Sequence, residues 1–179
     1  MKTALLAIAL SLLAGSAARA QDITAEPDPP NGVTVFSPKT VERVRSQNAS
    51  FVFWRVYPVI TQSLDGNTKR AALKVEITTP VGVNRKTTLI INVDGQMFSD
   101  SPQWTMLGSF GDRAVALVDL HDEAGTLSFQ RIASANAISL TEMHKNEQIT
   151  VRLAGKNLDV FKTMFAKYNE LSPRQSARD

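Results

Sequence analysis

The sequence predicts a mainly β protein, an antiparallel β-sandwich or barrel that ends in a C-terminal amphipathic α-helix. Many short segments alternate apolar with polar residues or are rich in β-branched and aromatic residues, and turn residues separate them at fairly even spacing. Strands and helices do not alternate regularly, which argues against a parallel sheet. Only the last apolar segment has a clear helical period.

The first 20 residues are predicted to be a signal peptide that is cleaved after Ala20. Lys2 gives a positive start, residues 4–14 form an apolar run, and Ala18-Arg19-Ala20 is a small-x-small cleavage signal. The run is shorter than the ~20 residues that a membrane-spanning helix needs, so we expect no transmembrane anchor after cleavage. We therefore expect a periplasmic or secreted bacterial protein.

The rest of the chain is expected to be one domain between two flexible ends. Residues 21–32, QDITAEPDPPNG, hold three prolines and three acids without periodicity, which is typical of a flexible tether. Residues 33–171 are predicted to form a single β-rich domain that ends in a helix. Residues 172–179 are predicted to be a disordered tail.

Seven segments are predicted to be strands from their β-branched, aromatic or alternating composition. They are residues 33–36, 51–60, 71–79, 87–93, 114–120, 126–132 and 148–155. In the third segment Leu73, Val75 and Ile77 point to one face and polar residues to the other, so the polar face is expected to be exposed to solvent. The second segment, residues 51–60, has large apolar side chains on both faces. We therefore expect other parts of the protein to pack on both sides of at least part of it.

Helical structure is predicted at three places. Leu158, Phe161, Phe165 and Tyr168 form a stripe at helical spacing, so this helix is expected to pack on a sheet. Ser37-Pro38 fits a helix start. Ser139 and Glu142 fit a capping box, which favours a helical turn over residues 140–145.

One charged segment offers a metal site as an alternative reading. Asp119, His121, Asp122 and Glu123 lie together in the sequence, and an imidazole with carboxylates can bind a divalent cation. The plainer interpretation, which we prefer, is a polar turn between two apolar strands, because Asp, Glu and Gly are common turn residues. A small metal- or ligand-binding protein therefore stays an alternative function.

No sequence motif favours an enzyme. The chain contains neither a P-loop nor a dinucleotide fingerprint, it lacks the Gly-x-Ser-x-Gly nucleophile pattern, and it has no cysteine. A hydrolase built on dispersed carboxylates stays an alternative, because such groups meet only in space. We expect no catalytic residues and no cofactor.

The charge balance argues against a nucleic-acid partner. Of the 20 basic residues, Lys2 and Arg19 lie in the leader, which leaves 18 basic residues against 17 acidic ones. A chain so close to neutral has no general attraction for phosphate. If they are exposed, Trp54 and Trp104 are the side chains expected to contribute most to binding a protein partner. Trp104 is expected in a loop over residues 98–110.

In its order of elements the chain resembles the invasion-associated locus B (IalB) family of small exported bacterial proteins. The likeness is densest over residues 71–95, a strand, a Pro-x-Gly break and a strand ending in Val-Asp-Gly. It recurs where residues 149–155 lead into the helix of residues 156–168. The resemblance implies a periplasmic or surface β-sandwich associated with contact between bacterium and host, with no catalytic residues. Family members commonly carry cysteines, so a family disulfide cannot form here.

These observations together predict a non-enzymatic exported protein. It is expected to act as a binding or accessory protein of the bacterial envelope, with an envelope or host protein as its partner.

Overall fold

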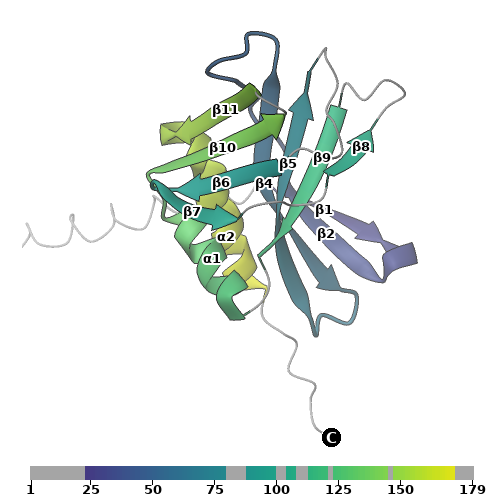
Figure 1. The fold of residues 1–179 in the computed structure, drawn as a ribbon. Coiled ribbons are helices and arrows are strands. Elements are labelled where there is room, and N and C mark those ends of the chain that lie inside the picture. The colour runs from purple at the N-terminus through teal and green to yellow at the C-terminus, as the bar shows by residue number, and fades with distance from the viewer. Residues whose placement is uncertain are drawn as a thin grey trace, which may run out of the picture.

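The computed structural model describes residues 23–79, 88–99, 104–107, 113–120, 123–144 and 147–171. The protein is mainly β, with two antiparallel sheets in a sandwich-like arrangement and a C-terminal helix (Figure 1). The predicted signal peptide and the predicted tail lie outside the described residues. Within the described ranges, no helix is long and apolar enough to cross a membrane.

The larger sheet, sheet A, contains seven strands within the described ranges. Its order is β1 (Ile23–Asp28), β2 (Val33–Pro38), β4 (Phe53–Ser63), β5 (Lys69–Thr78), β9 (Arg113–Asp119) and β8 (Trp104–Leu107). The short strand β3 (Val44–Arg45) pairs with the start of β4, whereas β2 pairs with its end. All of these pairings are antiparallel.

The smaller sheet, sheet B, has the order β11 (Glu147–Ala154), β10 (Ala137–His144), β6 (Thr88–Val93) and β7 (Gln96–Ser99). Helix α1 (Glu123–Ala133) leads from sheet A to sheet B. Helix α2 (Asp159–Glu170) follows β11 through the 3-10 helix η2 (Gly155–Leu158), and a second 3-10 helix, η1 (Pro29–Asn31), joins β1 to β2.

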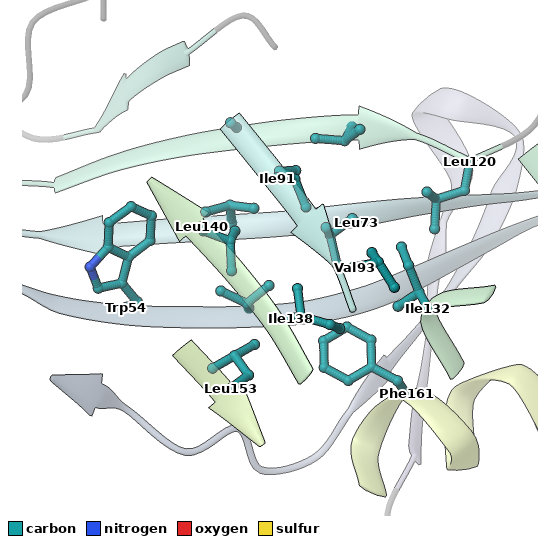
Figure 2. Packing of buried hydrophobic residues seen from close by; sticks show 14 of the residues in the cluster. Trp54, Leu73, Ile91, Val93, Leu120, Ile132, Ile138, Leu140, Leu153 and Phe161 are labelled. Carbon is teal, nitrogen blue, oxygen red and sulfur yellow. The ribbon is translucent and has the colours of Figure 1, made fainter. Parts of the chain in front are cut away.

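The hydrophobic core lies between the two sheets and is closed by the helices. Trp54 and Leu73 of sheet A, Ile91 and Leu140 of sheet B and Phe161 of α2 are all buried in it (Figure 2). The indole N–H of Trp54 donates to Oγ of Ser46 at 2.7 Å, so this buried donor has a hydrogen-bond partner.

The predicted fold class is confirmed, in its sandwich-like form rather than as a closed barrel. Strands were expected within β2, β4, β5, β6, β9 and β11, and they are found there. Leu73, Val75 and Ile77 are buried as their alternation predicts. The terminal helix is also confirmed, and its residues Phe161, Met164 and Tyr168 are buried.

The tether prediction is wrong for the part of residues 21–32 that is described. Ile23–Asp28 is strand β1, which pairs with all of β2, and Gly32 turns the chain with a φ of 65°. Prolines suggested a tether because they cannot donate hydrogen bonds to a ladder. In an edge strand such as β1, however, half of the backbone donors need no partner.

Two local predictions are reversed in type. The strand expected over residues 126–132 is part of helix α1, in which Phe129, Ile132 and Ala133 are buried at helical spacing. The helical turn expected over residues 140–145 is instead strand β10 up to His144. Pairing with β6 on one side and β11 on the other outweighs the local capping signal.

Two further predictions fail at strand ends. Ser37-Pro38 does not begin a helix, because β2 continues through Pro38 and residues 39–43 form no regular element. The loop expected over residues 98–110 is interrupted by strand, because β7 reaches Ser99 and β8 spans Trp104–Leu107.

Candidate binding face on the outer side of the large sheet

The outer face of sheet A, opposite the core, carries three rows of side chains set by the strand register. Residues directly opposite each other on paired strands point to the same face. The first row is Arg45, Phe53, Thr78 and Arg113, the second is Arg55, Glu76 and Val115, and the third is Tyr57, Lys74 and Leu117. We call these residues, with Arg43, the basic–aromatic face.

Phe53 lies beneath two guanidinium groups. The Arg43 guanidinium carbon is 4.8 Å from the centre of the Phe53 ring, and that of Arg45 is 5.7 Å away. Both distances are within the range of cation–π attraction. The ring therefore fixes two positive charges at the start of β4.

The face has an excess of positive charge. Five of its residues are cationic, and Glu76 is its one carboxylate. Arg43, Arg45 and Arg113 are exposed, and none forms an ion pair with a carboxylate among the described residues. These three arginines leave the face with charge that an anionic partner can neutralise.

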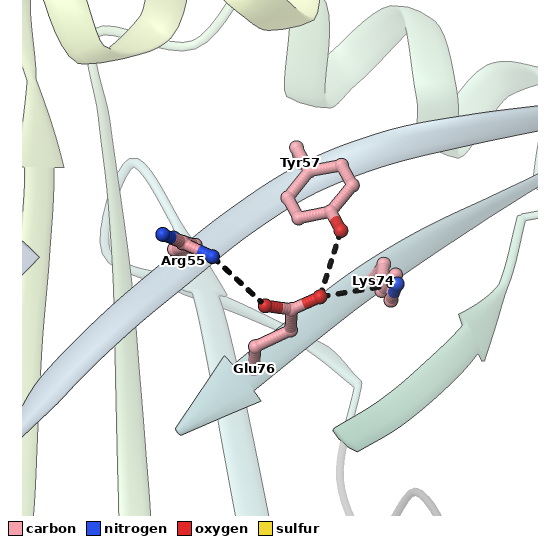
Figure 3. A network of polar contacts seen from close by, with 4 residues as sticks. All are labelled: Arg55, Tyr57, Lys74 and Glu76. Carbon is pink, nitrogen blue, oxygen red and sulfur yellow. Dashed lines mark hydrogen bonds and ion pairs between the residues drawn. The ribbon is translucent and has the colours of Figure 1, made fainter. Parts of the chain in front are cut away.

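Glu76 is held by three neighbours (Figure 3). The Tyr57 hydroxyl donates to Oε1 of Glu76 at 2.8 Å, and Nζ of Lys74 lies 3.0 Å from the same oxygen. Nη1 of Arg55 lies 3.8 Å from Oε2. The Glu76 side chain is only 15% exposed, so these contacts are partly shielded from water.

The network shifts the pKa values of its members. Burial alone would raise the pKa of Glu76, but hydrogen bonds from Tyr57 and Lys74, with the charges of Lys74 and Arg55, outweigh it and lower that pKa. Burial alone would lower the pKa of Lys74, yet its hydrogen bonds to Tyr57 and Glu76 raise it. Burial raises the pKa of Tyr57. At neutral pH the network therefore holds a carboxylate, an ammonium and a neutral phenol.

Exposed apolar groups accompany these charges. Leu117 is 57% exposed and lies beside Lys74 in the register. Phe51, which precedes β4, is 72% exposed. The central part of many protein interfaces likewise combines large apolar side chains with arginine and tyrosine.

Of the two tryptophans predicted from the sequence, Trp54 does not contribute its side chain to this face. Trp54 is fully buried, so its prediction as a partner-binding residue is wrong. The alternation of β4 places it on the core face, between the outward-facing Phe53 and Arg55. Trp104 begins β8 and is paired in register with Ala116, and nothing of its side chain is described.

Only two of the four candidate metal ligands, Asp119 and Glu123, lie within the described residues. Asp119 ends β9, opposite Ala72 in the row beyond Lys74, and Glu123 begins α1. His121 and Asp122 lie outside the described residues. Within the described ranges no group of three or more His, Cys, Asp or Glu side chains is placed to hold a metal ion.

Sequence reasoning missed the basic–aromatic face because its rows join distant segments. The alternation of Arg43 with Arg45, and of Phe53 with Arg55 and Tyr57, is visible in the sequence. However, only the pairing of β3 with β4 places the arginines at 43 and 45 beside the aromatic and basic residues of β4.

Comparison with protein-family models and with curated proteins gives no relative from which a function could be carried over. No protein-family model matches the sequence, and no curated protein matches it. The functional argument therefore depends on the chemistry of the basic–aromatic face.

Proposed function

We propose that this chain is an exported, non-enzymatic binding protein of the bacterial envelope, and that its basic–aromatic face docks an acidic surface of a partner protein. The observation that carries the proposal is the set of exposed arginines, Arg43, Arg45 and Arg113, without a carboxylate partner in the described structure. A guanidinium binds a carboxylate through two parallel hydrogen bonds, which gives both affinity and orientation.

The composition of the face favours a protein partner over a lipid surface or a nucleic acid. Four of its five cations are arginines, and two of these stack on Phe53. Protein interfaces are enriched in arginine, tyrosine and phenylalanine and depleted in lysine. Surfaces that bind membrane electrostatically are commonly rich in flexible lysine as well as arginine.

The export part of the proposal is supported by the leader pattern of residues 1–20. Fractionation of cells that express the full chain, followed by N-terminal sequencing, tests it. We expect a chain that begins at Gln21 in the periplasm or the medium. A full-length chain found only in the cytosol would contradict export and would leave the docking proposal standing.

The docking part is tested with a photo-crosslinking amino acid placed at Leu117 in intact cells. A matched control places the same amino acid at Leu64, which is similarly exposed at 54% but lies in the turn between β4 and β5. We expect a protein crosslink from position 117 and not from position 64, and the crosslinked peptide of the partner should be acidic.

Two further outcomes would overturn the docking proposal. Crosslinks from position 117 to lipid or nucleic acid would assign the face to another class of partner. Equal crosslinking from both positions would show that contact with the partner does not depend on the face. In the supported case, the purified partner should bind more weakly as salt increases, because exposed charge pairs are screened.

A further inference from the structure

The edge of strand β4 that faces β2 and β3 is open at its middle. Strand β2 pairs with residues 60–63 of β4, and β3 pairs with residues 53–54. Continuing the register of β2 sets Pro38 opposite Pro58, and neither proline has a backbone N–H to donate. The ladder between β2 and β4 therefore ends at these prolines, and residues 55–57 have no strand partner on this edge in the described structure.

The segment that joins β2 to β3, residues 39–43, bends away from this open stretch. It forms no regular element. From Pro38 to Val44 the chain advances six residues, whereas β4 advances only four over the same span, so the two extra residues must leave the edge of β4. A cavity of ≈ 320 Å³ lies at this place. It is lined by both ends of the opening, by Val41 of the joining segment and by Val56 of β4, with η2 and α2 opposite.

Val56, at the middle of the open stretch, has a backbone N–H and C=O directed toward the joining segment. In an antiparallel ladder the two groups of one residue point to the same edge, and successive residues alternate between edges. The C=O of Val52 accepts from the N–H of Ser46 at 2.9 Å, so the even-numbered residues at the start of β4 point toward β3. No backbone hydrogen bond joins Val56 to residues 39–43. Val56 keeps 4% of its surface accessible, and it lines the cavity.

The lining of the cavity combines polar with apolar side chains. Val41 and Val160, which are both partly exposed, supply apolar surface. The polar side chains are those of Thr40, Glu42, Lys156, Asp159 and Thr163. An extended peptide has the same mixed character, because its backbone is polar and its side chains can be apolar.

We propose that this cavity binds a short extended peptide, one residue of which pairs with Val56 as a neighbouring strand would. The N–H of that residue donates to the C=O of Val56, and its C=O accepts from the N–H of Val56, as in a hydrogen-bonded antiparallel pair. Residues opposite each other point to the same face of a sheet. The Val56 side chain belongs to the core, so the side chain of the peptide residue points the same way, toward Val160, and should be aliphatic.

The volume of the cavity limits the peptide to about two residues. An extended residue in a packed sheet occupies roughly 160 Å³, given a rise of ~3.3 Å, a strand spacing of ~4.8 Å and a layer spacing of ~10 Å. A longer strand would meet Pro38 at one end of the opening and Val44 at the other. The occupant is therefore a short free peptide rather than a strand of a partner protein. The inference is independent of the basic–aromatic face, because none of the residues of that face lines the cavity.

Titration followed by amide NMR spectra tests the proposal with three probes of nearly equal size. The first is N-acetyl-leucine N-methylamide, which should bind and shift the amide signal of Val56. The second replaces the leucine N–H by an ester oxygen. It should bind about fivefold more weakly or worse, because the C=O of Val56 then stays unpaired. The third replaces leucine by asparagine, which keeps the shape but not the apolar surface, and it should also bind at least about fivefold more weakly.

A filled cavity supplies a variant and its control. Val160→Trp, on α2, should abolish binding of the leucine probe, whereas Ala166→Trp adds the same ring at an exposed position of the same helix and should leave binding unchanged. The amide spectrum of each variant shows whether it is folded. The comparison of the three probes uses the unmodified chain, so it decides the matter even if Val160→Trp does not fold.

Four results would overturn the proposal. They are no binding of the leucine probe, equal binding of the ester or the asparagine probe, an unshifted Val56 signal in the bound state, and binding that survives in folded Val160→Trp. A longer peptide with leucine at its centre should bind no more tightly than the leucine probe. Tighter binding of the longer peptide would also overturn the proposal, because it would assign the open edge to a strand of a partner protein.

Discussion

Replacing Glu76 with glutamine tests whether the network on sheet A stabilises the fold through charge. The glutamine keeps an oxygen that can accept from Tyr57, but it removes the negative charge that Lys74 and Arg55 face. A hydrogen bond to a charged group contributes about 1 kcal/mol more than a neutral one. The half-exposed Arg55 at 3.8 Å adds at most a few tenths of a kcal/mol after screening by solvent. We expect a loss of about 1–2 kcal/mol at pH 7.

The loss should depend on pH with a definite sign. The folded state lowers the pKa of Glu76 below its ordinary value of 4.5. The stability that this carboxylate contributes is therefore fully present above pH 4.5 and is lost as the pH falls through the lower pKa of the folded state. The difference between the unmodified chain and Glu76→Gln should shrink as the pH falls below 4.5, because protonation removes the same charge.

Urea unfolding at several pH values between 7 and 2.5, followed by circular dichroism, measures this difference. Glu42→Gln is the matched control, because Glu42 pairs with Lys156 at 3.0 Å but both side chains are well exposed. Its effect should stay within about 0.5 kcal/mol at every pH. The reasoning is refuted if Glu76→Gln costs no more than the control, or if its cost is the same at pH 2.5 and pH 7.

Three other predictions concern single side chains. Asn157→Leu should raise the free energy of unfolding of the ligand-free protein by about 1 kcal/mol, because it removes an unpaired buried acceptor, and an unchanged or lower value in urea unfolding would contradict this. Trp54→Ala should lower the free energy of unfolding by about 3–5 kcal/mol in the same assay, because it leaves a cavity in the core and removes the donor to Ser46. A decrease of less than about 1 kcal/mol would contradict this burial. In Tyr168→Phe, which leaves Tyr57 as the one tyrosine, absorbance of the phenolate should develop above the ordinary pKa of 10.0 because burial opposes ionisation, and ionisation at or below 10.0 would argue against the network.

Most of the strand pattern could be predicted because the burial of one sheet face leaves a period of two in the sequence. Leu73, Val75 and Ile77 alternate with polar residues, and they are buried. The same logic gave α2, whose apolar residues recur at helical spacing. Where each face of the sheet has a distinct environment, local pattern and tertiary structure agree.

The failures arise where tertiary pairing or burial decides between two local readings. Phe129 and Ile132 suit a strand by composition, yet they lie three apart and are buried in α1. Ser139 and Glu142 fit a capping box, but they belong to β10, which has strand partners on both sides. A single sequence carries no record of those partners.

The candidate sites were harder to predict because they join segments that are far apart in the chain. Arg45 and Arg113 share a row only through the pairing of β3, β4, β5 and β9. Val56 becomes notable only when β2 and β3 are found on one edge of β4 with an opening between them. Neither relation leaves a spacing pattern in the sequence.

The most direct test of the central claim is the affinity of the partner captured at Leu117 for two charge-reversed chains. Arg113→Glu reverses a charge on the basic–aromatic face, and Arg152→Glu reverses an exposed charge on β11 of sheet B. If the face docks an acidic surface, Arg113→Glu should weaken binding about tenfold or more, and Arg152→Glu less than about twofold. Equal effects of the two reversals, or none from Arg113→Glu, would contradict the proposed role of the face.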